Sequence, residues 1–327
     1  MKDPSSHLGK LTSWIRAPAA LEKLATFPLE TKRAKVYPKV VKLAAEYWSD
    51  KKKGGSGLEV QNFVKFIVAE LAVEPDLASQ VFTALAAKPL QVRPEHFYTL
   101  VAHSRDVRAV PLMKGLWKTY RFQWERAALA LNAKELADDV AALLESPSYD
   151  MELPLAAGIL GGSAFTALQK HAKSDFVSRE DMVALGLALG GHDDETYFKN
   201  ISRARGGMAA RRFHTALHAP KPKARLEAVD DLEKQLDRSN MGILTGVLLG
   251  FSRLLLSDDA KVVERAAPLF MNYLEEMNQN VRGQPEPWHA YFLECAQAAI
   301  TRGVSKKTRA TLDEIRQSVP HCSAFKS

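Results

Sequence analysis

The sequence predicts an all-α protein of irregular helical repeats, a HEAT- or armadillo-like α-solenoid of about fifteen short antiparallel helices. Apolar residues recur at helical spacing along the whole chain, and alternating β-type runs are almost absent. Three leucine- and glycine-rich segments, 155–165, 182–192 and 243–252, are irregularly spaced, which favours degenerate stacked helix pairs over a strict repeat. A compact all-α bundle is the main alternative.

In the first half of the chain, prolines and polar connections separate the helical patterns. Helices are predicted over residues 18–26, 32–48, 58–72, 75–87, 94–103, 105–118 and 122–144. Pro38 is expected to kink or split the helix over 32–48, because proline lacks an N–H and clashes with the preceding turn. The segment from Lys51 to Gly57 is predicted to be a charged, flexible loop.

The second half continues in the same way. Helices are predicted over residues 153–172, 178–190, 194–205, 208–218, 222–238, 241–256, 259–280, 287–302 and 305–318. Ser178 and Asp181 form a capping pattern at the start of one helix, and Gly190 and Gly191 mark its end. The tail from Pro320 is predicted to be loose.

The most apolar stretch, residues 241–256, places Gly242, Gly246 and Gly250 four residues apart on one helical face. Such a bare face is expected to let the backbone of a neighbouring helix come close. The stretch would form about 24 Å of helix, whereas a membrane span needs about 20 apolar residues. Since Arg253 also lies inside it, a buried core helix is predicted rather than a transmembrane segment.

Charge is unevenly distributed along the chain, which carries a net charge of +7. Residues 1–53 hold twelve Lys/Arg and five Asp/Glu, whereas residues 226–280 hold five and ten. We therefore divide the chain into a basic helical segment 1–53, a helical-repeat domain 58–319 and a loose tail 320–327. This asymmetry suggests anionic partners near the N-terminus and neutral or basic partners further on, although chance and solubility explain it equally well. Two cysteines in so long a chain argue against a disulfide framework.

The motifs that suggest chemistry are incomplete. Glycines 54, 55 and 57 follow three lysines but lack the GK[ST] that a phosphate-binding loop requires. His214 and His218 are spaced to share a metal, but Thr215 stands where the zinc-protease pattern has glutamate. We therefore predict no catalytic residue, no cofactor, no metal site and no enzyme activity.

The best candidate for binding is a run of cations without any acid, between residues 201 and 226. Its members are Arg203, Arg205, Arg211, Arg212, Lys221, Lys223 and Arg225. They are suited to an acidic protein surface first, with nucleic acid and an anionic lipid headgroup as alternatives. An ordinary solvated face is the remaining interpretation, because charge alone does not identify a partner.

These observations favour a non-catalytic scaffold or subunit of a large protein assembly. The alternative is an organellar RNA-binding helical-repeat protein that uses segment 201–226 and the basic N-terminus.

In length, mass, basic alanine-rich helices and segments such as MGILTGVLLGFSRLLL, the whole chain resembles the ATP-synthase-associated subunits of chlorophycean green algae. Those proteins build the peripheral stalk of the dimeric mitochondrial ATP synthase. The resemblance rests on composition over the full length and on no diagnostic motif. It implies a structural role that braces the stalk and dimer, at the soluble side of the inner mitochondrial membrane and without catalytic or cofactor-binding residues. Without it, we expect an intracellular soluble protein.

Overall fold

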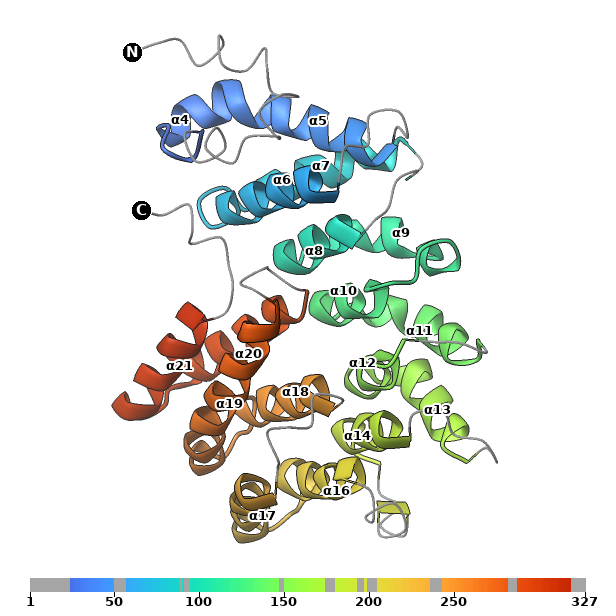
Figure 1. Ribbon diagram of the computed structural model, residues 1–327, viewed down its shortest axis with the longest axis vertical. Coiled ribbons are helices and arrows are strands. Elements are labelled where there is room, and N and C mark those ends of the chain that lie inside the picture. The colour runs from blue at the N-terminus through green and yellow to red at the C-terminus, as the bar shows by residue number, and fades with distance from the viewer. Residues whose placement is uncertain are drawn as a thin grey trace. The chain divides into compact units, whose positions relative to one another are not determined.

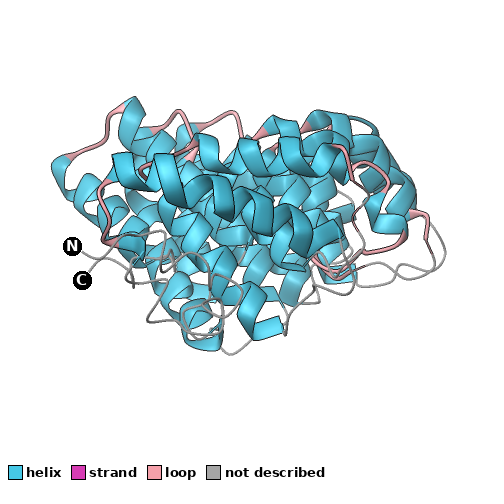
Figure 2. Ribbon diagram, turned by 90° about the horizontal axis from the view of Figure 1, so that it is seen from above, coloured by secondary structure: helices cyan, strands magenta, loops and turns pink. Residues whose placement is uncertain are grey.

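The structure of the chain is a computed structural model that describes residues 24–49, 57–88, 90, 95–146, 150–173, 180–192, 197–198, 205–235, 243–281 and 287–318. Every regular element in this described part is a helix, so the predicted all-α helical-repeat fold is confirmed (Figure 1). Figure 2 shows the same composition of helices and connecting loops. The chain divides into two compact units, with the main boundary between Leu131 and Asn132.

The predicted division into segments 1–53, 58–319 and 320–327 stays a prediction. Both of its boundaries fall at residues outside the described part, 50–56 and 319–327. Most of the helix predicted over 18–26 and most of the helix predicted over 194–205 also lie outside the described residues.

In the first unit, helices two apart along the chain pack on one another: α5 on α7, α6 on α8, and α8 on α10. Its core is aromatic, and the rings of Trp48 and Phe82 both meet Phe97 edge-on, with centroids 5.5 and 5.9 Å apart. The elements of this unit are α4 (Leu29–Thr31), η1 (Lys32–Val36), α5 (Tyr37–Ser49), α6 (Gly57–Glu70), α7 (Asp76–Ala86), α8 (Glu95–Ser104), η2 (Val107–Ala109), α9 (Val110–Met113), η3 (Leu116–Lys118) and α10 (Trp124–Leu131).

A buried ion pair joins η1 to α6 in this unit. Lys32 Nζ lies 2.7 Å from Glu70 Oε2, and the two residues are 6% and 4% exposed. Tyr37 Oη donates to the same carboxylate oxygen at 2.6 Å, and the Lys32 ammonium also donates to the carbonyl of Ala25 at 3.0 Å. Because both charges have left water, each depends on these partners.

Pro38 does not split the helix. The residues just before it form the π-helical turn η1, and the chain then continues into α5 without an interruption. Proline cannot donate the usual hydrogen bond to the carbonyl four residues earlier, and a π turn is one local way to absorb that loss.

Three predicted helices are broken, and single-helix predictions for them were wrong. The stretch 105–118 consists of η2, α9 and η3, with Gly115 at φ 68°. The stretch 122–144 breaks at Asn132, which has φ 50°, and 153–172 breaks at Gly161, which has φ 74°. Left-handed backbone angles end a right-handed helix, and the apolar pattern does not report them.

The second unit contains the longer helices. Its elements are η4 (Lys134–Leu136), α11 (Ala137–Leu144), α12 (Leu153–Leu160), α13 (Gly162–His171), α14 (Glu180–Gly190), α16 (Arg205–His218), α17 (Pro222–Gln235), α18 (Leu244–Leu255), α19 (Ala260–Val281), α20 (Pro287–Arg302) and α21 (Lys306–Ser318). Helix α12 packs on α14 and α14 on α16, while α16 pairs with α17 and α18 with α19. Helix α19 also packs against both α17 and α21.

Glycines let the backbones of α12 and α14 come into direct contact. A Cβ atom on Gly158 would overlap the carbonyl oxygen of Gly186, and one on Gly186 would overlap the carbonyl oxygen of Pro154. At α18 the expected backbone approach is not observed. There Leu185 fills the space beside Gly246, and the ring of Phe213 fills the space beside Gly250. The third glycine of that stripe, Gly242, lies outside the described residues.

Helix α18 is buried along most of its length, as the sequence predicts for a core helix. Among the residues that the structure describes, no helix combines the length and apolarity needed to cross a membrane.

We expect Gly186→Ala to destabilise the second unit. Helix propensity alone would favour alanine by about 1 kcal/mol, but overpacking against backbone costs about 1–3 kcal/mol or more. Amide hydrogen exchange in α12 and α14 would be faster in the variant than in the wild type. Slower exchange would mean that the two backbones are not in contact.

We also expect Glu70→Ala to cost about 3–5 kcal/mol, because it leaves the Lys32 ammonium buried without its carboxylate. The control is Glu145→Ala, which removes the exposed pair between Glu145 and Lys170 in the second unit. That change should cost less than about 1 kcal/mol. Hydrogen exchange measured over a denaturant titration gives the free energy of unfolding of each unit, and so the loss in each variant. Equal losses in the two variants would mean that burial does not make the Lys32–Glu70 pair more important than an exposed pair.

Candidate functional site

The described part of the predicted basic segment comprises helix α16, the connection to α17 and the first turn of α17. Arg203 lies outside the described residues, and Arg205 is the first residue of α16, with a side chain outside the described part. The other five cations lie on α16, α17 and the connection between them. They are Arg211, Arg212, Lys221, Lys223 and Arg225.

Three of these cations form ion pairs with acids from outside the segment. Arg212 Nη2 lies 3.1 Å from Asp231 Oδ2 and Lys223 Nζ lies 3.7 Å from Glu227 Oε1, both acids on α17.

Arg225 pairs with the connection between α18 and α19. Its Nη1 lies 3.1 Å from Asp258 Oδ1, and its Nε donates to the carbonyl of Ala219 at 2.6 Å. Folding therefore supplies carboxylates to a stretch that has none of its own.

Arg211 and Lys221 are the remaining exposed cations of the segment for which the described part of the chain shows no ion pair. Exposed pairs such as that of Lys223 are weak and can exchange partners, whereas Arg225 is also held by the backbone. The described part of the segment thus offers two exposed cations with no ion pair, beside others that have an acidic partner.

The two candidate histidines lie on one face of α16, but they are used in packing. Their ring centroids are 5.3 Å apart, and Phe198 covers His214 at 4.9 Å. His218 Nε2 lies 3.0 Å from the carbonyl of Ala188, which fixes the tautomer with the proton on Nε2. Within the described residues, no group of three or more His, Cys, Asp and Glu is arranged to hold a metal ion.

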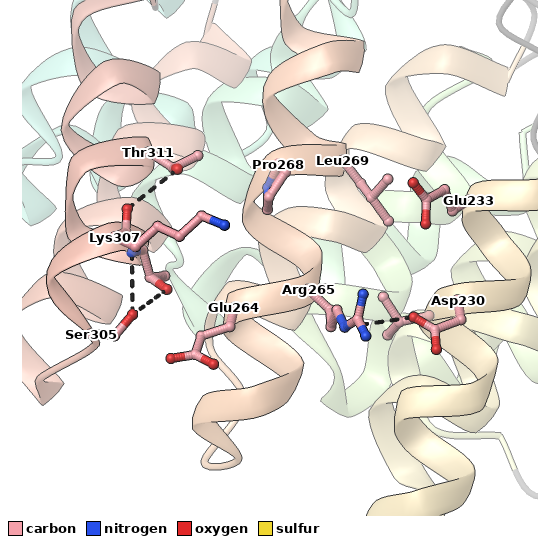
Figure 3. A pocket seen from close by; sticks show the side chains of 11 residues that line it. Asp230, Glu233, Glu264, Arg265, Pro268, Leu269, Ser305, Lys307 and Thr311 are labelled. Atoms are coloured by element: carbon pink, nitrogen blue, oxygen red, sulfur yellow. Dashed lines mark hydrogen bonds and ion pairs between the residues drawn. The ribbon is translucent and has the colours of Figure 1, made fainter.

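A second feature, which the sequence did not reveal, is a groove over α19, between α17 and α21 (Figure 3). Its volume is about 360 Å³. Of its apolar lining residues Pro268 is exposed, whereas Val229 and Leu269 are buried, and charged side chains from all three helices line the rest. One signal was present in the sequence: Pro268 lies inside the 22-residue helix α19, where proline is unusual.

Comparison with protein-family models, curated proteins and solved structures finds no match to this chain.

Stability of the second unit should fall in mild acid. Desolvation of the ring lowers the pKa of His218, and the nearby charge of His214 lowers it further. Because the pKa of His218 is lowered in the folded state, folding favours the neutral ring. The stability that this provides is present above the ordinary pKa of about 6.5 and is lost as the pH falls through the pKa of the folded state.

We expect the melting temperature to drop between pH 7.5 and pH 5.5, and His218→Gln to reduce that drop. Thermal melts of both proteins at the two pH values measure it. An unchanged drop in the variant would assign the pH dependence to other groups.

Proposed function

We propose that this protein is a non-catalytic scaffold that holds other protein subunits together in a large assembly. The observation that carries the proposal is the outer surface of α16, α17, α19 and α21. It combines exposed cations, exposed carboxylates and a groove lined by charged side chains of both signs, over helices that pack on one another. Stacked helix pairs offer long, stiff surfaces of this kind to other proteins.

The resemblance to the chlorophycean subunits makes the proposal more specific. In that form, the chain braces the peripheral stalk of the dimeric mitochondrial ATP synthase, and segment 201–226 meets an acidic surface of a neighbouring subunit. The ion pairs of Arg212, Lys223 and Arg225 favour a protein partner over RNA, because each reduces the positive charge available to phosphates.

Gentle native purification at moderate salt, followed by mass spectrometry and stoichiometry of the recovered complex, tests the proposal. We expect a complex of fixed composition, with ATP-synthase subunits in the more specific form. Recovery as a free monomer with RNA, released by salt in proportion to the phosphates contacted, would overturn the proposal in favour of RNA binding. A free monomer with neither would overturn both functions.

We further expect Arg211→Glu/Lys221→Glu to weaken the purified complex about tenfold, mainly through slower association, because the charges of two exposed cations of the segment are reversed. The control is Lys114→Glu/Lys134→Glu, which makes the same change in net charge at two exposed lysines elsewhere. Binding rates measured at two salt concentrations would separate the variants. Equal weakening in both would mean that the basic segment is not the docking surface.

A further inference from the structure

The connection between α9 and α10 in the first unit is a closed loop, residues 114–123, made largely of aromatic and basic residues (Figure 1). Trp124 Nε1 donates to the carbonyl of Met113 at 3.0 Å, which ties the two ends of the loop together. The hydroxyl of Tyr98, a buried residue of α8, donates to the carbonyl of Tyr120 at 2.6 Å. These bonds hold the loop on the helices, so its backbone conformation is set before any partner binds.

The loop leaves its large apolar side chains in contact with water, and none of its residues is buried. Phe122 is 54% exposed, and Leu116, Trp117 and Tyr120 are each partly exposed. Apolar surface in water is unfavourable, and its concentration in one short loop indicates a surface that a partner covers.

The same loop is basic and contains no acid. Its cations are Lys114, Lys118 and Arg121, and the described residues show no ion pair for the two exposed lysines. Glu125, the first acid after the loop, is 1% exposed, and its Oε1 lies 3.8 Å from Arg126 Nε. The loop therefore attracts an anionic partner.

Cations lie directly beside the aromatic rings. Lys118 Nζ is 5.7 Å from the centroid of the Trp117 ring, and the guanidinium carbon of Arg126 is 6.0 Å from the centroid of the Phe122 ring. At a membrane surface, aromatic rings are favoured at the depth of the headgroups, where phosphates lie next to apolar chains. Long cationic side chains can there keep their charge at the phosphates while their apolar neighbours enter more deeply.

We propose that the loop 114–123 docks on a membrane surface containing anionic lipids. Leu116, Trp117 and Phe122 enter the headgroup region, and the lysines meet lipid phosphates. Membrane attachment through this loop adds to the scaffold function and does not depend on it.

Two observations favour a membrane over other anionic partners. The loop has ten residues, whereas a stable protein interface uses roughly 20–30 on each side. Bases of single-stranded RNA stack on aromatic rings, but the exposed apolar surface here also includes aliphatic residues, namely Leu116 and, on α9, Pro111 and Leu112. A lipid surface accepts aromatic and aliphatic side chains alike.

Co-sedimentation of the full chain with lipid vesicles tests the proposal. Vesicles of phosphatidylcholine with about 30% phosphatidylserine should bind the protein about tenfold more tightly than vesicles of phosphatidylcholine alone, because the cations of the loop meet anionic headgroups. Raising the salt concentration should weaken this preference.

Two single substitutions locate the surface, each with a matched control in the same unit. Phe122→Ser should weaken binding about tenfold, whereas Val73→Ser, at an apolar side chain that is 46% exposed, should leave it unchanged. Lys118→Glu should also weaken binding about tenfold, and Lys42→Glu, at an exposed lysine of α5, should weaken it less than about twofold. All four side chains are exposed, and circular dichroism confirms that the variants remain helical.

Tryptophan fluorescence gives a second measurement. Lipids with brominated acyl chains should quench the wild-type protein, and the quenching should be much smaller in Trp117→Phe. The reason is that Trp48, Trp124 and Trp288 are buried in the protein.

Equal binding to both kinds of vesicle, losses in the controls equal to those in Phe122→Ser and Lys118→Glu, or unchanged quenching in Trp117→Phe would each overturn the proposal. Polyuridylate that displaces the protein from vesicles, and whose own binding is lost in Phe122→Ser, would also overturn it, because the loop would then be an RNA site. The vesicle assay needs no protein partner, so its failure is distinguishable from failure of the scaffold function in native purification.

Discussion

The packing of the second unit depends on the direct contact between the backbones of α12 and α14. Two glycines, Gly158 and Gly186, make it possible, because a side chain at either position would occupy the space of a carbonyl group. The same two helices present Leu155 and Leu185 to α18 at Gly246. Beside the close backbone contact of α12 and α14, these leucine side chains fill the space that Gly246 leaves on α18. A densely packed interior of this kind is destabilised by a change in side-chain volume.

This interior explains how α16 and α18 are held. The ring of Phe213 fits against Gly250 and packs edge-on against Phe251 at 5.2 Å, which fixes α16 on α18. Helices α17 and α19 are then placed outside them, with polar faces toward solvent. The cations of the basic segment and the carboxylates of α17 are brought together as a consequence of this core, and their ion pairs add little to its stability.

Two surface features of the second unit follow from that arrangement, the basic segment and the groove. Among the described residues of the basic segment, Arg211 and Lys221 are exposed cations with no ion pair, beside cations that have acidic partners. The groove over α19 is lined by carboxylates and cations from three helices of the same unit, around the exposed Pro268. The pair of Lys32 and Glu70 in the first unit contributes to folding rather than to a binding surface, because both side chains are buried.

The sequence by itself determined that the protein is all-α, where most helices lie, and that α18 is a core helix, because these depend on local periodicity and composition. It did not predict the breaks at Asn132 and Gly161, where single backbone angles interrupt a continuous apolar pattern. It identified the cations of segment 201–226, but not that Asp231, Glu227 and Asp258 neutralise three of them. The groove over α19 was decided by the tertiary structure alone, because its residues come from three helices that only long-range packing brings together.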